Sequence, residues 1–127
     1  MIIQQHFVPG ISHSSYIVAG NNACAVIDPE RNICPYLDSA KRMGLKITHI
    51  LETHLHADFI SGHLDLEEAT GARIYAPASA NCAFPHEPLK EGDRIKLEDI
   101  IFSVIETPGH TPEHISYIAA DTSKADD

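Results

Sequence analysis

Two histidine-rich segments, each placed after an expected strand, constrain the fold of this 127-residue chain more than any other feature. Six of its nine histidines fall within residues 49–63 and 110–114. The first segment contains Thr-His-Leu-His-Ala-Asp-Phe-Ile-Ser-Gly-His over residues 53–63, between an expected strand and an expected helix. Loops at the ends of strands commonly carry functional residues in α/β sheets. The chain is therefore expected to place this loop at the end of a sheet.

Short apolar, β-branched stretches predict most of the secondary structure, and two stretches have a helical period instead. Strands are predicted over residues 2–8, 15–19, 23–27, 46–51, 73–76, 94–97, 100–105 and 114–120. Helices are predicted over 35–43, with Pro35 near its start and Gly44 at its end, and over 61–70, with Ser61 as its cap. This order predicts a single layered, mixed α/β domain spanning residues 1–127.

Composition excludes several classes of partner. The net charge of −9 argues against nucleic acid, because too few cations are present to neutralise a phosphate backbone. No lysine- or arginine-rich run could contact a membrane surface, and no apolar run approaches the roughly 20 residues of a transmembrane helix. The three cysteines are odd in number and widely spaced, and no signal peptide is recognised at the start. These features predict a cytoplasmic protein.

The first segment predicts a metal site. If residues 54–58 are extended, His54, His56 and Asp58 point to the same side, because side chains alternate along an extended chain. Two imidazoles and a carboxylate on one side are the outline of a metal-binding site. Leu55 and Ala57 then face the body of the domain.

The second segment supplies a further candidate ligand. Pro108 and Gly109 form a rigid turn directly after a strand, and this turn can hold His110 at a fixed point. The remaining histidines have simpler interpretations: His63 on a helix surface, His49 structural within a strand, His6 and His86 on the surface, His13 in a turn or lining a pocket, and His114 either beside the metal ligands or merely starting a strand. Cys34 is expected near a helix N-terminus and is interpreted as inert.

These motifs resemble those of the metallo-β-lactamase superfamily. The resemblance rests on His54-x-His56-x-Asp58 followed by Gly62-His63, and on the Thr-Pro-Gly-His-Thr string over residues 107–111. The fuller strings over 52–63 and 106–114, with 13–18 and 26–29, are most similar to the persulfide dioxygenase branch, which includes forms fused to rhodanese domains. The resemblance implies an αββα sandwich, a form of α/β (α+β) fold, with a metal site at one edge of its two sheets.

The resemblance also implies a set of ligands. In the dioxygenase branch two histidines and an aspartate hold a single Fe(II), and the histidines correspond to His54 and His110 here. His56 and Asp58 match positions that bind metal in dinuclear hydrolases such as glyoxalase II, and in the dioxygenases they line the site. One Fe(II) per chain is therefore expected, with Zn(II) as the alternative.

Two departures from the family pattern matter. Phe59 stands where the pattern has a histidine, which removes a ligand of a second metal and argues against a dinuclear hydrolase. The family's aspartate ligand belongs to a Gly-Asp-Thr motif, whereas Asp121-Thr122 follows Ala120 and comes too soon after the last strand. The chain is therefore expected to be the N-terminal, C-terminally truncated part of the family's domain.

The function expected from this resemblance is oxidation of a thiol-carried persulfide, such as glutathione persulfide, to sulfite with O₂. No protein nucleophile is required for that reaction, and the shortened chain is expected to be impaired in it. The first alternative is a thioester hydrolase of the glyoxalase II kind. The second is a non-catalytic fragment that buries its sheet edges by forming a homo-oligomer. In either catalytic case the partner is a small thiol persulfide or thioester.

Overall fold

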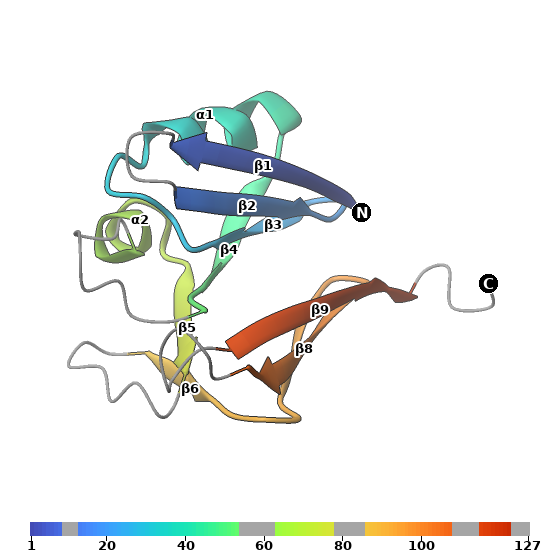
Figure 1. The fold of residues 1–127 in the computed structure, drawn as a ribbon. Coiled ribbons are helices and arrows are strands. Elements are labelled where there is room, and N and C mark those ends of the chain that lie inside the picture. Colours follow the sequence, from blue (N-terminus) through green and yellow to red (C-terminus); the bar gives the residue numbers. More distant parts are fainter. Residues whose placement is uncertain (9–12, 54–62, 78–85, 108–114, 123–127) are drawn as a thin grey trace.

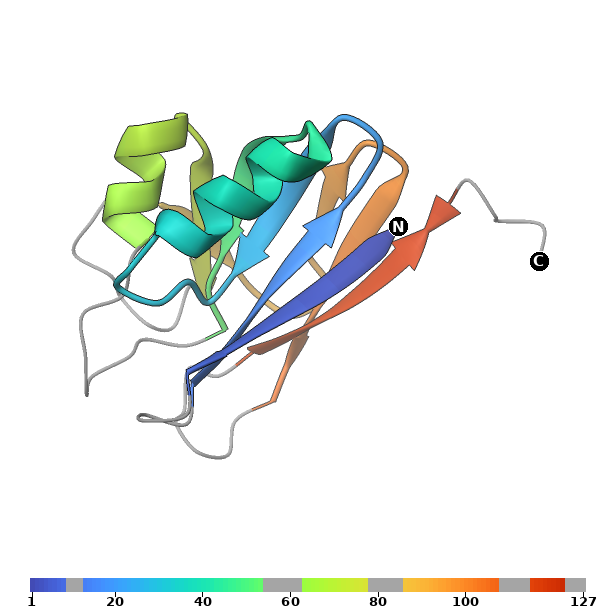
Figure 2. The same ribbon diagram turned by 90° about the horizontal axis from the view of Figure 1, so that it is seen from above.

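The fold consists of two facing β-sheets with both helices on the outer face of the larger sheet (Figures 1 and 2). The computed structural model describes residues 1–8, 13–53, 63–77, 86–107 and 115–122. These three layers confirm a mixed αββ arrangement, which is part of the expected αββα sandwich. Among the described helices, none is long and apolar enough to cross a membrane.

The larger sheet has six strands whose order in space follows their order in the chain. These strands are β1 (Ile2–Val8), β2 (His13–Ala19), β3 (Ala23–Ile27), β4 (Lys46–Leu51), β5 (Arg73–Pro77) and β6 (Glu87–Leu89). β1 to β3 pair antiparallel, and β3 to β6 pair parallel. Antiparallel neighbours can be joined by a short turn, whereas parallel neighbours need a crossover connection. Helices α1 (Cys34–Met43) and α2 (His63–Thr70) belong to the first two crossovers.

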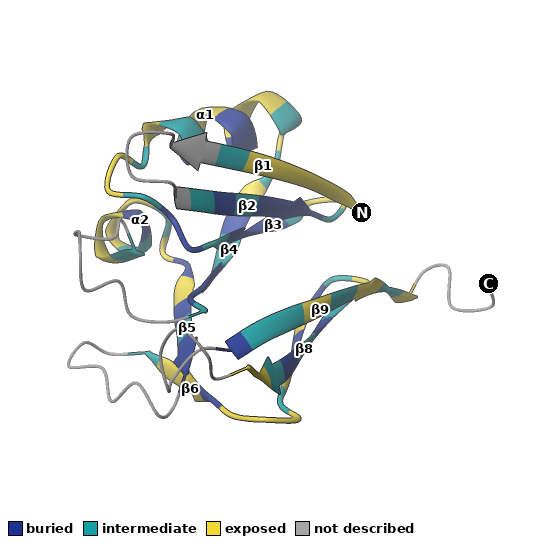
Figure 3. Ribbon diagram, in the orientation of Figure 1, coloured by how far each residue is buried: buried dark blue, intermediate teal, exposed yellow. Residues whose placement is uncertain are grey.

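The smaller sheet is an antiparallel meander of β7 (Arg94–Leu97), β8 (Ile100–Glu106) and β9 (Ile115–Asp121). Alternate residues of β8 are buried, so one face of this sheet packs against the larger sheet (Figure 3). Phe102 is fully buried in this layer, where its ring meets the edge of Tyr117 at 6.5 Å. A second apolar core lies between the larger sheet and the helices, around the fully buried Tyr36.

The sequence predicts the ends of α1 well. Pro35 lies in the first turn, where its missing N–H costs no helical hydrogen bond. Gly44 ends the helix with a φ of +70°, and its N–H reaches the carbonyl groups of Ala40 and Lys41. Both ends therefore follow from local backbone chemistry.

Strand β6 is absent from the sequence prediction, and the described ends of β2, β5 and β8 differ from it by one or two residues. Strand β6 was not predicted, because it has only three residues and contains Pro88. A proline is tolerated there because β6 lies at the edge of the sheet. Helix α2 begins at His63 in the structure, whereas Ser61, its predicted cap, lies outside the described residues.

Glu98, in the turn between β7 and β8, links the smaller sheet to the larger sheet at one end of the two sheets. Its carboxylate accepts hydrogen bonds from the backbone N–H groups of Asn22, at 3.0 Å, and Ala23, at 3.1 Å. Gly20 leaves room for this contact, because a Cβ atom there would lie 2.3 Å from Glu98 Oε1. The backbone N–H of Asn22 is the main cause that lowers the pKa of Glu98 below its ordinary value.

We expect this contact to make stability depend on pH. Because the pKa of Glu98 is lower in the folded chain than in the unfolded one, its stabilisation is present above the unfolded pKa. It is lost as the pH falls through the lowered folded pKa. Urea unfolding should show Glu98→Gln less stable than the unaltered chain near neutral pH, with the difference shrinking as the pH falls below the ordinary pKa of a glutamate.

A matched control is Glu68→Gln, on the exposed side of α2. This variant should unfold like the unaltered chain across the same pH range. A Glu98→Gln difference that stays constant with pH would show that the carboxylate charge does not stabilise the junction.

Candidate metal centre

The predicted ligands fall in two segments that lie outside the described residues. His54, His56 and Asp58 belong to residues 54–62, and His110 belongs to residues 108–114. These four positions therefore stay predictions. Among the residues that the structure does describe, no group of three histidine, cysteine or acidic side chains is placed to hold a metal ion. The structure instead describes the residues on either side of each segment.

The flanking residues bring the two segments to one place. The N–H of Ile115, the first residue of β9, donates a 2.8 Å hydrogen bond to the carbonyl of Thr53, which follows β4. Residues 54–62 begin directly after Thr53, and residues 108–114 end directly before Ile115. The chain therefore enters the first segment and leaves the second at the same point, where the two sheets meet.

Asp28 fixes Thr53 from the end of β3. Its Oδ1 accepts a 2.8 Å hydrogen bond from the Thr53 N–H, and its Oδ2 accepts a 2.6 Å bond from the Thr53 hydroxyl. Asp28 is only 7% exposed and has a φ of +53°, a conformation that aspartate tolerates better than most residues. The sequence places Asp28 directly after an expected strand and within the string 26–29 that resembles the family, but it does not predict this contact with Thr53. The signal that could have found it is an acidic residue closing a buried apolar strand.

Glu52 is a second buried carboxylate beside the same point, with 1% of its surface exposed. Its N–H donates to the Tyr75 carbonyl at 2.8 Å, and its own carbonyl accepts the Tyr117 hydroxyl at 2.7 Å. Its Oε1 lies 3.1 Å from Nδ1 of His63. The prediction that His63 lies on the helix surface is therefore wrong, because this side chain is only 12% exposed and turns toward Glu52.

The electrostatics of this region favour a cation. Burial chiefly raises the pKa of Tyr117 well above its ordinary value, and the negative charges of Asp28 and Glu52 raise it further. Tyr117 therefore stays a neutral hydrogen-bond donor at physiological pH. Two buried carboxylates therefore lie beside the segment that begins with His54, and their negative charge favours a divalent metal ion bound by the predicted ligands.

His49 is structural, as predicted. Its Nδ1 lies 2.7 Å from the Thr48 hydroxyl, and its ring stacks on Tyr75 at 5.5 Å. Burial is the main cause that lowers the pKa of His49, and the charge of Arg73 adds to this. A hydrogen bond to the backbone of Lys96 opposes the shift. The imidazole therefore connects β4 to β7.

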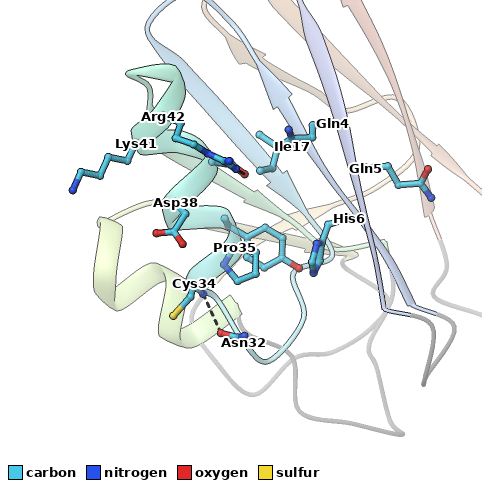
Figure 4. A pocket seen from close by; sticks show the side chains of 12 residues that line it. Gln4, Gln5, His6, Ile17, Asn32, Cys34, Pro35, Asp38, Lys41 and Arg42 are labelled. Atoms are coloured by element: carbon cyan, nitrogen blue, oxygen red, sulfur yellow. Dashed lines mark hydrogen bonds between the residues drawn. The ribbon is translucent and has the colours of Figure 1, made fainter.

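A cavity of about 690 Å³ lies between β1 and α1, on the helix side of the larger sheet (Figure 4). Polar side chains of both elements line it, among them His6 and Arg42. His6, predicted on the surface, has 34% of its side chain exposed, contacts the Glu30 carboxylate and makes a T-shaped ring contact with Tyr36. Cys34 is exposed at the first residue of α1, as expected. None of the lining residues flanks a predicted metal-binding segment.

The comparisons with known proteins agree with the fold. The sequence profile described as the metallo-beta-lactamase superfamily matches residues 8–123. A metallo-beta-lactamase from Staphylococcus aureus subsp. aureus COL has a TM-score of 0.90 at 33% identity, covering 97% of this chain and 39% of that one. ETHE1 from Myxococcus xanthus has a TM-score of 0.87 at 29% identity, covering 94% of this chain and 54% of that one.

Curated relatives correct the predicted reaction. A protein of Methylobacterium nodulans is 40% identical over 99 residues, or 76% of this chain and 38% of the relative. One of Rhodospirillum rubrum is 43% identical over 103 residues, or 80% of this chain and 40% of the relative. Both are named hydroxyacylglutathione hydrolase. The prediction of a persulfide dioxygenase is therefore wrong, and the thioester hydrolase alternative is better supported. The chain spans about 40% of the length of these relatives.

Replacing Asp28 by alanine should weaken the junction at Thr53. This variant removes the acceptor of both the Thr53 N–H and its hydroxyl hydrogen bond. Loss of hydrogen bonds to a charged, buried group should lower the free energy of unfolding by about 1–3 kcal/mol. Urea unfolding at neutral pH measures this change.

Asp38→Ala, on the exposed side of α1, is the control and should change the free energy of unfolding little. Equal losses in the two variants would contradict a specific role for Asp28.

Proposed function

The chain belongs to the metallo-beta-lactamase superfamily, and from this premise we propose that it is the metal-binding N-terminal part of a glutathione thioester hydrolase. The observation that carries the proposal is the group of relatives named hydroxyacylglutathione hydrolase, about 40% identical over three quarters or more of this chain. The proposed substrate is a hydroxyacyl thioester of glutathione. The proposed products are the free hydroxy acid and glutathione.

The proposed ligands are His54, His56, Asp58 and His110. Imidazole and carboxylate side chains are suitable ligands for divalent transition metals such as Zn(II) and Fe(II). When bound, such an ion polarises a carbonyl group and makes water acidic enough to attack at neutral pH. The described residues would orient these ligands, because Asp28 holds Thr53 directly before His54.

The proposed reaction needs no nucleophile from the protein. Oxygen of a water molecule attacks the thioester carbonyl carbon, the carbon–sulfur bond breaks, and the thiolate leaves and takes a proton. The buried carboxylates of Asp28 and Glu52 support this chemistry indirectly, because they hold the backbone beside the ligands. In this scheme Tyr117 anchors the Glu52 carbonyl and does not exchange protons with substrate.

Phe59 sets an expectation about metal content. The family pattern has a histidine at this position, and its absence removes one ligand of a second metal ion. We therefore propose one metal ion per chain, with Zn(II) and Fe(II) as the two ions to compare. Elemental analysis after anaerobic reconstitution should give about one equivalent, which His54→Ala and His110→Ala should each abolish.

The reaction is tested by measuring thiol release from a hydroxyacylglutathione. The metal-loaded chain should release free thiol faster than the metal-free chain, and His54→Ala should lower the rate to that of the metal-free chain. Removal of the metal by a chelator should have the same effect. Because the chain spans about 40% of its relatives, the rate is expected to lie below that of a full-length hydrolase.

Glu68→Gln on the exposed side of α2 is the matched control, and its rate should equal that of the unaltered chain. A chain that holds stoichiometric metal but releases no thiol above the metal-free rate would contradict the proposed function.

A further inference from the structure

A contact between two buried side chains joins the two ends of the first predicted metal-binding segment. Glu52 lies just before residues 54–62, separated from them by Thr53, and His63 follows them directly. The Glu52 Oε1 and the His63 Nδ1 are 3.1 Å apart. This contact therefore joins the parts of the chain on either side of a segment that begins with His54 and contains two further proposed ligands.

Two hydrogen bonds hold the backbone of Glu52, so this residue forms a fixed anchor for His63. Its N–H is bonded to the Tyr75 carbonyl of β5, and its carbonyl is bonded to the Tyr117 hydroxyl of β9. The carboxylate itself is 1% exposed, so water does not compete for it. These contacts tie the position of Glu52 to both sheets and leave its side chain directed toward the start of α2.

His63 is the residue through which Glu52 contacts helix α2. It is the first residue of that helix and is 12% exposed, and Leu66 in the following turn is fully buried in the core under the helix. The Glu52–His63 contact therefore fixes the start of α2 relative to the end of β4. Both ends of residues 54–62 are consequently set by described parts of the fold before any ligand binds.

We propose that Glu52 and His63 are a pair of positioning residues that hold the two ends of residues 54–62 at the separation needed for metal binding. This inference rests on the proposed ligands His54, His56 and Asp58. Holding the ends in the metal-free chain lowers the entropy that must be lost when the ligands converge on an ion. The pair acts through the backbone and does not itself contact metal or substrate.

A positioning role and a purely structural role predict different changes in the stability of the metal-free chain when the pair is replaced. Burying a carboxylate is costly, so replacing a buried polar pair by apolar residues of similar size is often neutral or stabilising. When both residues are replaced, as Glu52→Met together with His63→Leu, a positioning pair should therefore lose metal affinity, while the metal-free chain unfolds at the same or a higher denaturant concentration. A single replacement leaves one partner buried without the other, so the comparison of stability is made on the double variant. A pair retained for stability should instead lower both quantities together.

The test measures Zn(II) affinity by competition with a chromogenic chelator, together with urea unfolding of the metal-free chain. Glu52→Met and His63→Leu should each weaken Zn(II) binding about tenfold, the lower end of the effect expected for residues that orient ligands. The double variant should be no weaker than either single variant, because one contact is lost in all three. Glu52→Gln keeps an oxygen acceptor and should recover most of the affinity.

A second readout needs no metal. In the metal-free chain, amide hydrogen exchange at Ile115, whose N–H is bonded to the Thr53 carbonyl, should become faster in Glu52→Met. Exchange at Val104, bonded to the Asp93 carbonyl in the smaller sheet, should stay unchanged. The matched control Glu68→Gln, on the exposed side of α2, should leave both exchange rates and the Zn(II) affinity unchanged.

The outcomes separate this inference from the proposed function. Unchanged Zn(II) affinity in Glu52→Met and His63→Leu, with thiol release intact, would overturn the positioning role and leave the hydrolase proposal standing. In the double variant, affinity that falls only in parallel with resistance to urea would also overturn it. Weakened affinity with unchanged or raised stability of the double variant would support it, even if the metal-loaded chain released no thiol.

Discussion

The backbone hydrogen bond from Ile115 to Thr53 is the contact on which the arrangement of the candidate site depends. Ile115 begins β9 of the smaller sheet and Thr53 follows β4 of the larger sheet, so residues nearly half the chain apart meet at 2.8 Å. Asp28 supports Thr53, and Tyr117 supports the neighbouring Glu52. Because each histidine-bearing segment adjoins this junction, the geometry available to a metal ion follows from how the sheets are joined.

Carboxylates lie at both ends of the pair of sheets, but their contacts and surroundings differ. Glu98 lies at a solvent-exposed junction and binds backbone N–H groups of Asn22 and Ala23. Asp28 and Glu52 are buried at the opposite end, beside the segments that carry the proposed ligands. An exposed carboxylate at one end contributes to stability that depends on pH. Buried carboxylates at the other end cost desolvation, which is consistent with a role in holding a cation site.

The correction of the reaction shows what short motifs can distinguish. The histidine and aspartate strings correctly identified the superfamily, because each ligand type and spacing has a direct chemical purpose. They did not distinguish an oxygenase from a hydrolase, since both chemistries use imidazole and carboxylate ligands on an open metal site. The relatives named hydroxyacylglutathione hydrolase share about 40% identity spread over most of the chain, well beyond these strings. Phe59 remains a departure from the family pattern, and it now bears on the number of metal ions.

The sequence by itself determined the elements whose signals are local. The period of apolar residues identified β3, β4, β7 and the helix that Pro35 and Gly44 delimit, because strand alternation and helix ends are properties of neighbouring residues. Only the tertiary structure decided that Asp28 holds Thr53 and that His63 turns inward to Glu52. These contacts join residues from different elements, and their formation depends on packing and burial. A histidine at a helix start has the same local sequence whether it faces water or a buried carboxylate. Only packing and burial in the folded chain decide which of the two it faces.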